Sequence, residues 1–218
     1  MAFTPTPQML DDALRFMRVP RPGREEALIE AVRETFANLE TFARPRSVWG
    51  RFHVSCLEGV ETGKDLKGLL SRSADCCLMA VTLGPEVDRQ IALAQRRGMW
   101  EGLALDACAS VRADAFCDEA QGEIEASLED GEGLTMRFSP GYGDAPLSLS
   151  EEIIVCLNAT RRIGLSMTRS FLMTPVKSVT AVLGVTAVPG ARGTEAGCDG
   201  TGCALCGRRE NCPYRGTV

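Results

Sequence analysis

The sequence predicts an α+β fold: a mostly antiparallel sheet with packed helices, followed by a cysteine-rich C-terminal tail. Two kinds of segment in the sequence, helical and strand-like, predict this fold class. Apolar residues recur with helical spacing in three long segments, at 6–17, 24–42 and 100–128. Short apolar runs typical of buried strands occur at 76–83 and 177–185. The composition then changes, because glycine and small residues dominate from residue 188 onward and indicate a flexible connector.

Composition limits the classes of protein to consider. The 218 residues are 44% hydrophobic and 24% charged, which suits a globular protein that buries a core. A net charge of −5 without a basic run argues against a nucleic-acid partner. The chain begins without a signal-peptide pattern and has no apolar run near the roughly 18 residues that span a bilayer. We therefore expect a cytoplasmic protein with a domain at 1–187 and a tail at 188–218.

The first half of the chain alternates helices and strands. Thr6 is expected to cap the first helix, with Pro7 at its first position. The only histidine, His53, falls in the strand expected at 47–56, and we expect it to be structural. Cys76 and Cys77 lie on opposite faces of a buried strand, so we expect them to pack in the core. The other segments expected here are a strand at 47–56, a short helix at 65–72 and a helix at 84–96.

The longest predicted helix covers residues 100–128 and has two distinct sides. Five apolar residues are predicted to mark the buried side: Leu103, Ala107, Val111, Ala115 and Ile124. Asp106, Ser110 and Asp114 lie four residues apart and share another stripe. Such a stripe is usually a solvated face.

The segments after this helix return to the sheet. A short strand is expected at 134–136, and Ser148 with Glu151 has the spacing of a capping box. The helix that it opens is predicted to continue to Arg162 and to end at Gly164. Strands at 165–168 and 177–185 follow.

The loop from Arg137 to Pro146 separates these two helical regions. Two prolines and two glycines fall within seven residues, so the loop must be a shaped turn. Arg137 offers a planar fork for a carboxylate, and Tyr142 offers a ring face and a hydroxyl. The residues alone leave two interpretations open, a well-ordered connection or a functional loop.

The motif Arg-x-x-x-Gly-Tyr-x-x-x-Pro at 137–146 resembles the signature of the reactivation domain of cobalamin-dependent methionine synthase. The likeness continues through 163–170 and 173–180, and it extends upstream along the helix from 102 to about 125. It covers roughly 102–185, with a looser match from Cys76. The chain looks like the short, free-standing members of that family, which lack the methyltransferase modules. The resemblance implies a twisted antiparallel sheet with helices packed around it.

The resemblance also implies a cofactor-binding site. Arg137 would hold the carboxylate of S-adenosylmethionine, and Tyr142 would pack along the ligand. Ser139 stands where the family usually has an alanine whose backbone contacts the ligand, and Gly141 would let the backbone come close. Asp114 falls at the position of a family glutamate that contacts S-adenosylmethionine.

Three departures from the family pattern affect this site. Asp114 is shorter than the family glutamate by one methylene. Gly131 stands where the family has a second acidic contact, with Glu132 next to it. A further family tyrosine, after the second strand, has no counterpart in this chain.

The implied activity is reductive reactivation of a corrinoid (vitamin B12) methyltransferase such as methionine synthase, in methionine biosynthesis. S-Adenosylmethionine would remethylate cob(II)alamin on that partner, with a flavodoxin or ferredoxin as reductant. The sulfonium already makes the methyl group electrophilic, so the protein needs chiefly to position it, and no catalytic acid or base is predicted. The chain would thus act as a component of the methyltransferase.

The tail contains four cysteines with C-x4-C-x2-C-x5-C spacing: Cys198, Cys203, Cys206 and Cys212. Ten cysteines without a secretion signal favour metal binding over disulfides. The spacing does not separate zinc from an iron–sulfur cluster, although a low-potential reaction favours the cluster. Tail disulfides or free thiols are the alternative.

Two other functions remain open at this point. One is an electron-transfer or scaffold module whose zinc or iron–sulfur tail serves a corrinoid protein without S-adenosylmethionine. The other is an S-adenosylmethionine sensor. Binding of S-adenosylmethionine and the absorbance spectrum of anaerobically purified protein discriminate between them.

Overall fold

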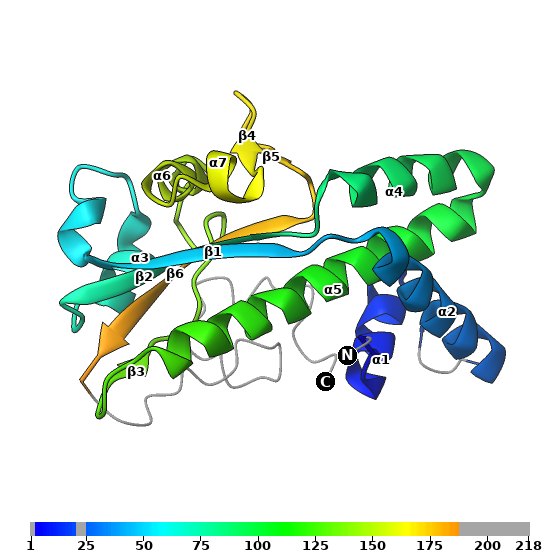
Figure 1. Ribbon diagram of the computed structural model, residues 1–218, viewed down its shortest axis with the longest axis horizontal. Helices are drawn as coiled ribbons and strands as arrows, with labels where there is room; N and C mark the ends of the chain where they lie inside the picture. Colours follow the sequence, from blue (N-terminus) through cyan, green and yellow to red (C-terminus); the bar gives the residue numbers. More distant parts are fainter. Residues whose placement is uncertain (1–2, 21–24, 188–218) are drawn as a thin grey trace. The chain divides into compact units, whose positions relative to one another are not determined.

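A computed structural model describes residues 3–20 and 25–187 (Figure 1). The tail, with the four predicted metal ligands, lies outside the described residues. The chain divides into two compact units, each built from three separate segments. The first unit comprises Met1–Ser47, Val81–Glu119 and Arg161–Val179, and the second comprises Val48–Ala80, Ala120–Thr160 and Thr180–Val218.

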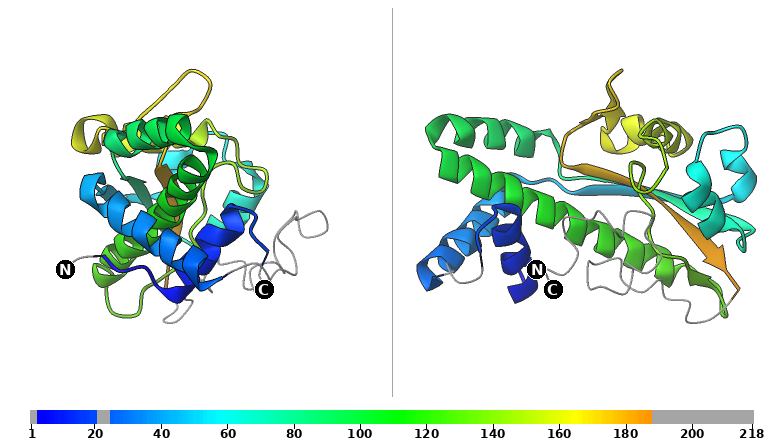
Figure 2. Two further views of the ribbon diagram at one scale, coloured as in Figure 1. Left: turned by 90° about the vertical axis from the view of Figure 1, so that its right-hand side faces the viewer. Right: turned by 180° about the vertical axis from the view of Figure 1, so that it is seen from behind.

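The first unit is mainly helical. Helices α1 (Pro7–Phe16) and α2 (Glu26–Phe42) lie beside α5 (Met99–Ala126), as both views of Figure 2 show. Helix α4 (Pro85–Arg97) precedes α5 in the chain, separated from it by Gly98. A small hairpin of β4 (Ser166–Met167) and β5 (Met173–Thr174) completes the unit, with Ser166 opposite Thr174.

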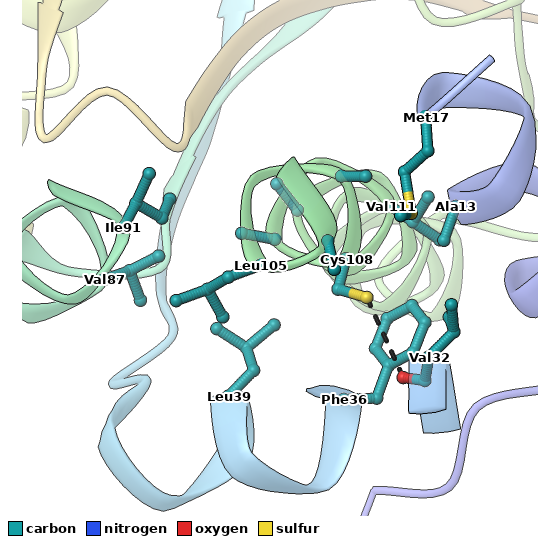
Figure 3. Close-up of a cluster of buried hydrophobic side chains, with 14 of the residues drawn as sticks. Ala13, Met17, Val32, Phe36, Leu39, Val87, Ile91, Leu105, Cys108 and Val111 are labelled. Carbon is teal, nitrogen blue, oxygen red and sulfur yellow. Dashed lines mark hydrogen bonds between the residues drawn. The ribbon is translucent and has the colours of Figure 1, made fainter. Parts of the chain in front are cut away.

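The core of the first unit forms where these helices meet (Figure 3). Phe36, Leu39 and Val32 on α2 are fully buried, and Leu105, Cys108 and Val111 on α5 pack against them. The spacing of these residues at three and four places them on one face of each helix. Burying each of the large side chains contributes about 1.5–3 kcal/mol relative to leaving it exposed. The core therefore follows directly from the helical periodicity of the sequence.

The second unit holds most of a four-stranded antiparallel sheet in the order β1-β2-β6-β3. Its strands are β1 (Arg46–His53), β2 (Asp75–Thr82), β3 (Gly133–Leu134) and β6 (Ser178–Thr186). Residues Gly133 and Leu134 pair antiparallel with Thr186 and Val185 at the sheet edge. A 3-10 turn (Val54–Leu57), α3 (Gly63–Leu70) and α6 (Leu149–Cys156) accompany the sheet, and α7 (Ala159–Ile163) follows.

Most predicted elements are confirmed. The Thr6 Oγ1 atom accepts a hydrogen bond from Met9 N, so Thr6 caps α1 as expected. Cys76 and Cys77 are buried in β2, as core packing requires. The His53 Nδ1 atom accepts from Ser55 N at 3.2 Å and caps the 3-10 turn, which is a structural role. Among the residues that the structure describes, none of the helices has both the length and the apolar character of a membrane span.

The capping box predicted at Ser148 is wrong. Ser148 has helical dihedral angles, and its side chain makes no capping hydrogen bond. The N–H groups of Leu149 and Ser150 already donate to the carbonyls of Pro146 and Leu147 in successive tight turns. An N-cap side chain requires extended backbone and free N–H groups, so neither condition is met here.

The single helix predicted up to Arg162 is also wrong, because it is interrupted. Helix α6 ends at Cys156, and α7 begins at Ala159. Asn158 lies between them with φ of 51°. Asparagine tolerates this left-handed conformation better than most residues do, and that conformation cannot continue a right-handed helix. The end at Gly164, with φ of 76°, is as predicted.

The predicted buried side of α5 is partly wrong. Val111, Ala107 and Ile124 are buried, but Leu103 is 42% exposed and Ala115 only half-buried. A step of four residues turns a helix by about 400°, so each step drifts by about 40° around the axis. Residues 103, 107, 111 and 115 follow such steps, so the first and the last of these four lie away from the buried face.

Candidate functional site

The loop from Arg137 to Pro146 lies in the second unit and is a series of tight turns. It begins on the sheet, where Phe138 exchanges two backbone hydrogen bonds with Val182 in β6, of 2.8 and 3.0 Å. Tyr142 N then donates to Ser139 O at 3.2 Å, and Ala145 N donates to Tyr142 O at 3.1 Å. Backbone bonds thus fix the direction in which the loop presents its side chains.

Two glycines are required by the loop itself. Gly141 has φ of 90°, and a Cβ at this position would lie 2.8 Å from Leu147 Cδ2. Gly143 has φ of 55°, and a Cβ there would overlap the Asp65 carboxylate. Any larger residue would strain the backbone or displace its neighbours. Gly141 is therefore explained by local geometry, whether or not a ligand approaches it.

Asp144 anchors the loop to the start of α3. Its Oδ2 atom accepts from Lys64 N at 2.6 Å, and its Oδ1 atom accepts from Asp65 N at 3.0 Å. These two backbone hydrogen bonds, with that of Asp65 the larger cause, lower the pKa of Asp144. The sequence contains no local signal for this contact, because the partners lie 80 and 79 residues apart.

Arg137 is half-buried at the beginning of the loop. Its Nη1 atom donates to Gln121 Oε1 at 3.2 Å, so the last turns of α5 orient the guanidinium. A guanidinium carries five N–H donors in a fixed fork. Orientation by Gln121 is therefore compatible with a bidentate contact to a carboxylate.

The other predicted loop residues differ in accessibility. Tyr142 is 70% exposed, so a face of its ring is accessible to a ligand. Ser139 is half-buried, and its carbonyl is part of the turn that ends at Tyr142. The loop thus brings Arg137, Ser139, Gly141 and Tyr142 together on one short segment.

Glu132 has a structural partner. Its carboxylate receives two hydrogen bonds from Arg51, with Nη1 at 2.8 Å and Nη2 at 2.7 Å. Arg51 Nε also donates to Asp75 at 2.9 Å, so this guanidinium joins β1, β2 and the segment before β3. The hydrogen bonds from Arg51 lower the pKa of Glu132. Glu132 is therefore engaged in linking the segment before β3 to β1 and β2.

Asp114 lies in the first unit, on the exposed side of α5. It lines a cavity of about 420 Å³ together with Asp106 and Ser110, the other members of its stripe. Lys177 also lines this cavity, and its Nζ atom lies 2.9 Å from Asp106 Oδ1 and 2.8 Å from Ser110 Oγ. All three residues of the stripe therefore line one cavity.

Sequence reasoning missed Lys177. It is the first residue of the apolar strand predicted at 177–185, and a lysine usually points to solvent. Its partner Ser110 is 67 residues away, so no short-range pattern could reveal the contact.

The sequence matches no protein-family model and no curated protein. Among solved structures, the chain is similar to the reactivation domain of MetH with AdoHcy bound. The TM-score is 0.55 and the sequence identity 16%, and the match covers 84% of this chain and 77% of the other. This chain has the fold of the MetH reactivation domain. The predicted α+β class and the predicted twisted-sheet family fold are thereby confirmed.

The part of the chain that the structure describes contains no cluster of candidate metal ligands. Within residues 3–20 and 25–187, no group of three or more histidine, cysteine or acidic side chains is placed to hold a metal ion. Six cysteines in this part are not joined in disulfides: Cys56, Cys76, Cys77, Cys108, Cys117 and Cys156. Burial raises the pKa of Cys77 to about 11 and that of Cys108 to about 12, which suits inert core residues.

Proposed function

We propose that this protein reactivates a corrinoid methyltransferase by S-adenosylmethionine-dependent remethylation of its cobalamin. The observation that carries the proposal is the Arg137–Pro146 loop, with its Arg-x-x-x-Gly-Tyr-x-x-x-Pro motif, in a chain with the MetH reactivation fold. The loop is fixed by backbone hydrogen bonds and by Asp144, so its side chains are presented without a large ordering cost.

Each loop residue has a defined role in this proposal. Arg137, oriented by Gln121, donates two parallel hydrogen bonds to the carboxylate of S-adenosylmethionine. Tyr142 packs its exposed ring along the ligand. Ser139 contacts the ligand through its backbone, and Gly141 leaves room for that approach.

The chemistry requires positioning more than proton transfer. One-electron reduction of the partner's cob(II)alamin, followed by transfer of the methyl group from the sulfonium, gives methylcobalamin and S-adenosylhomocysteine. Because the sulfur leaves as a neutral thioether, no residue of this chain has to take up or supply a proton. The task of Arg137 and Tyr142 is to hold the donor in one orientation.

The direct test combines this protein with a corrinoid methyltransferase from the same cell that lacks a reactivation domain. The visible spectrum of cob(II)alamin should convert to that of methylcobalamin, and only with both S-adenosylmethionine and a flavodoxin or ferredoxin reductant. Tyr142→Ala should slow the conversion while the circular dichroism spectrum stays unchanged.

Two results would oppose the proposal in different ways. Persistence of the cob(II)alamin spectrum with every such partner, in a protein that binds S-adenosylmethionine, would favour a sensor. Metal binding without any S-adenosylmethionine binding would favour an electron-transfer or scaffold module.

For the tail, we propose that Cys198, Cys203, Cys206 and Cys212 bind zinc or an iron–sulfur cluster. The support is the sequence, since one Cys-x-x-Cys pair with two further thiolates supplies four ligands. Anaerobically purified protein should contain stoichiometric metal by elemental analysis. A variant with both Cys203→Ser and Cys206→Ser should lose that metal but keep its helical circular dichroism spectrum. Intact protein without iron or zinc would refute the site.

A further inference from the structure

Two cysteines, Cys56 and Cys76, face each other within the second unit. Their Sγ atoms lie 4.0 Å apart, although the residues are 20 positions apart in the chain. Cys56 lies in the 3-10 turn after β1 and is half-buried, whereas Cys76 lies in β2 and is fully buried. A disulfide bond is about 2.0 Å long, so the sulfurs need to approach each other by about 2 Å to form one. A displacement of this size is within the reach of a rotamer change at Cys56.

Backbone hydrogen bonds hold the two segments that carry these cysteines beside each other. Val54 N donates to Ala74 O at 2.9 Å, two residues before each cysteine. Glu58 N donates to Ser55 O at 3.0 Å, which closes the 3-10 turn around Cys56. The fold therefore keeps the two thiols in contact before any reaction, and such proximity favours a bond-forming step.

The other two cysteines near this pair are less suited to the same bond. Cys77 follows Cys76 in β2, and successive side chains of a strand point to opposite faces of the sheet. Cys156 is exposed at the end of α6. Burial raises the pKa of Cys56, and the charge of Cys156 adds to that rise, so these two thiols are near each other. Cys76 is nevertheless the expected partner, because its sulfur contacts that of Cys56 directly.

The environments of Cys56 and Cys76 give the two thiols different parts in a reaction. Burial raises the pKa of both. The charge of Cys56 and the hydrogen bond between the thiols raise the pKa of Cys76 further, whereas the same hydrogen bond lowers that of Cys56. Cys56 is also the more accessible of the two. Cys56 is therefore the nucleophile, and its raised pKa makes the reaction slow at neutral pH, because only the thiolate attacks.

We propose that Cys56 and Cys76 are an oxidation site, at which a peroxide converts the two thiols into a reversible disulfide. Neither cysteine has a part in the proposed binding of S-adenosylmethionine, so the site is additional to the proposed function. Oxidation at a protein thiol of this kind proceeds through a sulfenic acid that a second thiol captures.

The reaction balances with hydrogen peroxide as the oxidant. The Cys56 thiolate attacks one peroxide oxygen, the O–O bond breaks, and Cys56 becomes a sulfenic acid. The hydroxide that leaves takes up the proton released by Cys56 and becomes water. The Cys76 sulfur then attacks the sulfenic sulfur, and the displaced hydroxide leaves as a second water with the proton of Cys76. The two thiols lose two electrons in total, and a dithiol reductant returns them by disulfide exchange.

The disulfide would restrain the segment that anchors the candidate loop. It encloses residues 57–75, which include α3. The N–H groups of Lys64 and Asp65 in the first turn of α3 bind the Asp144 carboxylate of the loop. A cross-link of this kind stabilises a fold chiefly by restricting the unfolded chain. The oxidised second unit should therefore resist unfolding better than the reduced one.

The test maps the disulfides of the full-length protein after treatment with a molar excess of hydrogen peroxide. Remaining thiols are alkylated, and the protein is digested with trypsin and analysed by mass spectrometry. The tryptic peptides 52–64 and 73–89 contain Cys56 and Cys76. They should be recovered as the main linked species that contains peptide 52–64, and as separate peptides after treatment with dithiothreitol.

Three alanine variants identify the bond and its effect. Cys56→Ala and Cys76→Ala should lose the linked species. Cys77→Ala, at the adjacent and equally buried position of β2, is the matched control and should keep it. Oxidation should raise the melting temperature of the wild type and of Cys77→Ala by at least about 3 °C, but not that of Cys56→Ala. If Cys76→Ala does not fold, Cys56→Ala and Cys77→Ala still supply the comparison.

Several outcomes would overturn this oxidation site. Wild-type protein in which peptide 52–64 stays unlinked would show that the two thiols do not react. Linkage of that peptide to 138–161 would assign the bond to Cys156, and linkage to the tail would assign it to a tail cysteine. Loss of the linked species in Cys77→Ala would identify the wrong residue of β2. A cross-linked protein with an unchanged melting temperature would refute the restraint of α3.

Discussion

The core of the first unit and the loop of the second are held in place by different forces. In the core, Phe36, Leu39 and Cys108 are fully removed from water, and their positions depend on apolar packing. In the loop, Tyr142, Gly143 and their neighbours are exposed, and hydrogen bonds fix the backbone. This chain thus stabilises its framework by burial and shapes its candidate site by directed polar contacts.

The two kinds of stabilisation should respond differently to change. Burial is insensitive to pH, but it is sensitive to any charge placed inside it. Polar contacts at the surface are individually weaker, and they depend on the protonation of the acidic partner. Substitutions in the two regions can therefore test the comparison, beginning with the largest expected effect.

Val111→Asp should be the most damaging substitution. Val111 is 5% exposed within the core where α5 meets α1 and α2. The change removes about 1.5–3 kcal/mol of apolar burial and adds an unpaired buried charge that costs several kcal/mol more. Together these effects approach the whole stability of a small domain, about 5–15 kcal/mol. Far-UV circular dichroism should show loss of helix at 25 °C.

The control for this variant is the same chemical change at an exposed site. Val155→Asp on α6 should cost less than about 0.5 kcal/mol, as surface substitutions usually do. Equal destabilisation of both variants in urea titrations would show that packing at Val111 is not what holds the first unit together.

Arg137→Ala should have the next largest effect, on ligand binding. Loss of a charge-assisted hydrogen bond should weaken S-adenosylmethionine binding by about 1.5–3 kcal/mol. Arg137→Lys should be nearly as damaging, because an ammonium cannot replace the bidentate fork. Isothermal titration calorimetry on folded variants measures both.

Arg161, an exposed arginine on α7, provides the matched control for charge. Arg161→Ala should leave the affinity unchanged within two-fold. If Arg137→Ala also binds as tightly as the wild type, the assignment of the carboxylate contact is wrong.

Features that depend on neighbouring residues could be predicted from the sequence, whereas contacts between distant residues could not. The helices with strong periodicity, the buried strand at Cys76–Cys77 and the cap at Thr6 depend on near neighbours, and they were predicted. The contact of Asp144 with Lys64 N spans 80 residues, and no local pattern encodes it. The capping box predicted at Ser148 from the local sequence was wrong. The N–H groups at the start of α6 already donate to backbone carbonyls of the preceding turn, so they do not bind the Ser148 side chain.

For the candidate site, the family motif placed Arg137, Ser139, Gly141 and Tyr142 on one loop, and the structure provides their geometry. The cavity lined by Lys177 was not predicted, because it depends on how α5 meets the segment before β6. Residues that act together through tertiary contacts leave little trace in a single sequence.

Asp144→Asn should show a smaller effect that depends on pH. Because hydrogen bonds in the fold lower the pKa of Asp144, the folded state favours the ionised carboxylate. Its contribution is therefore complete above the unfolded pKa, near 3.8, and is lost as the pH falls through the lower folded pKa. The melting temperature of Asp144→Asn should lie below that of the wild type at pH 7. The difference between the two should shrink once the pH falls below 3.8 and disappear below the folded pKa.

The expected shift is modest because Asp144 is exposed and solvent screens its charge. Melting curves recorded from pH 7 down to well below 3.8 supply the measurement. A difference that did not shrink anywhere in this range would mean that the carboxylate does not hold the loop through its charge.

The smallest effects on unfolding free energy are expected for substitutions at the residues just before α1 and α6. Thr6 caps α1 in the first unit through its side chain, with Thr6 Oγ1 3.3 Å from Met9 N, whereas Ser148 makes no such bond at α6 in the second. Thr6→Ala should therefore cost about 1 kcal/mol of unfolding free energy, and Ser148→Ala less than about 0.5 kcal/mol, as at an ordinary surface position. Urea titrations of the two variants give both values. Ser148→Ala leaves the backbone hydrogen bonds of the turn that begins at Pro146 unchanged. If it nevertheless cost as much unfolding free energy as Thr6→Ala, the Ser148 side chain would be capping α6, and the capping box would be correct.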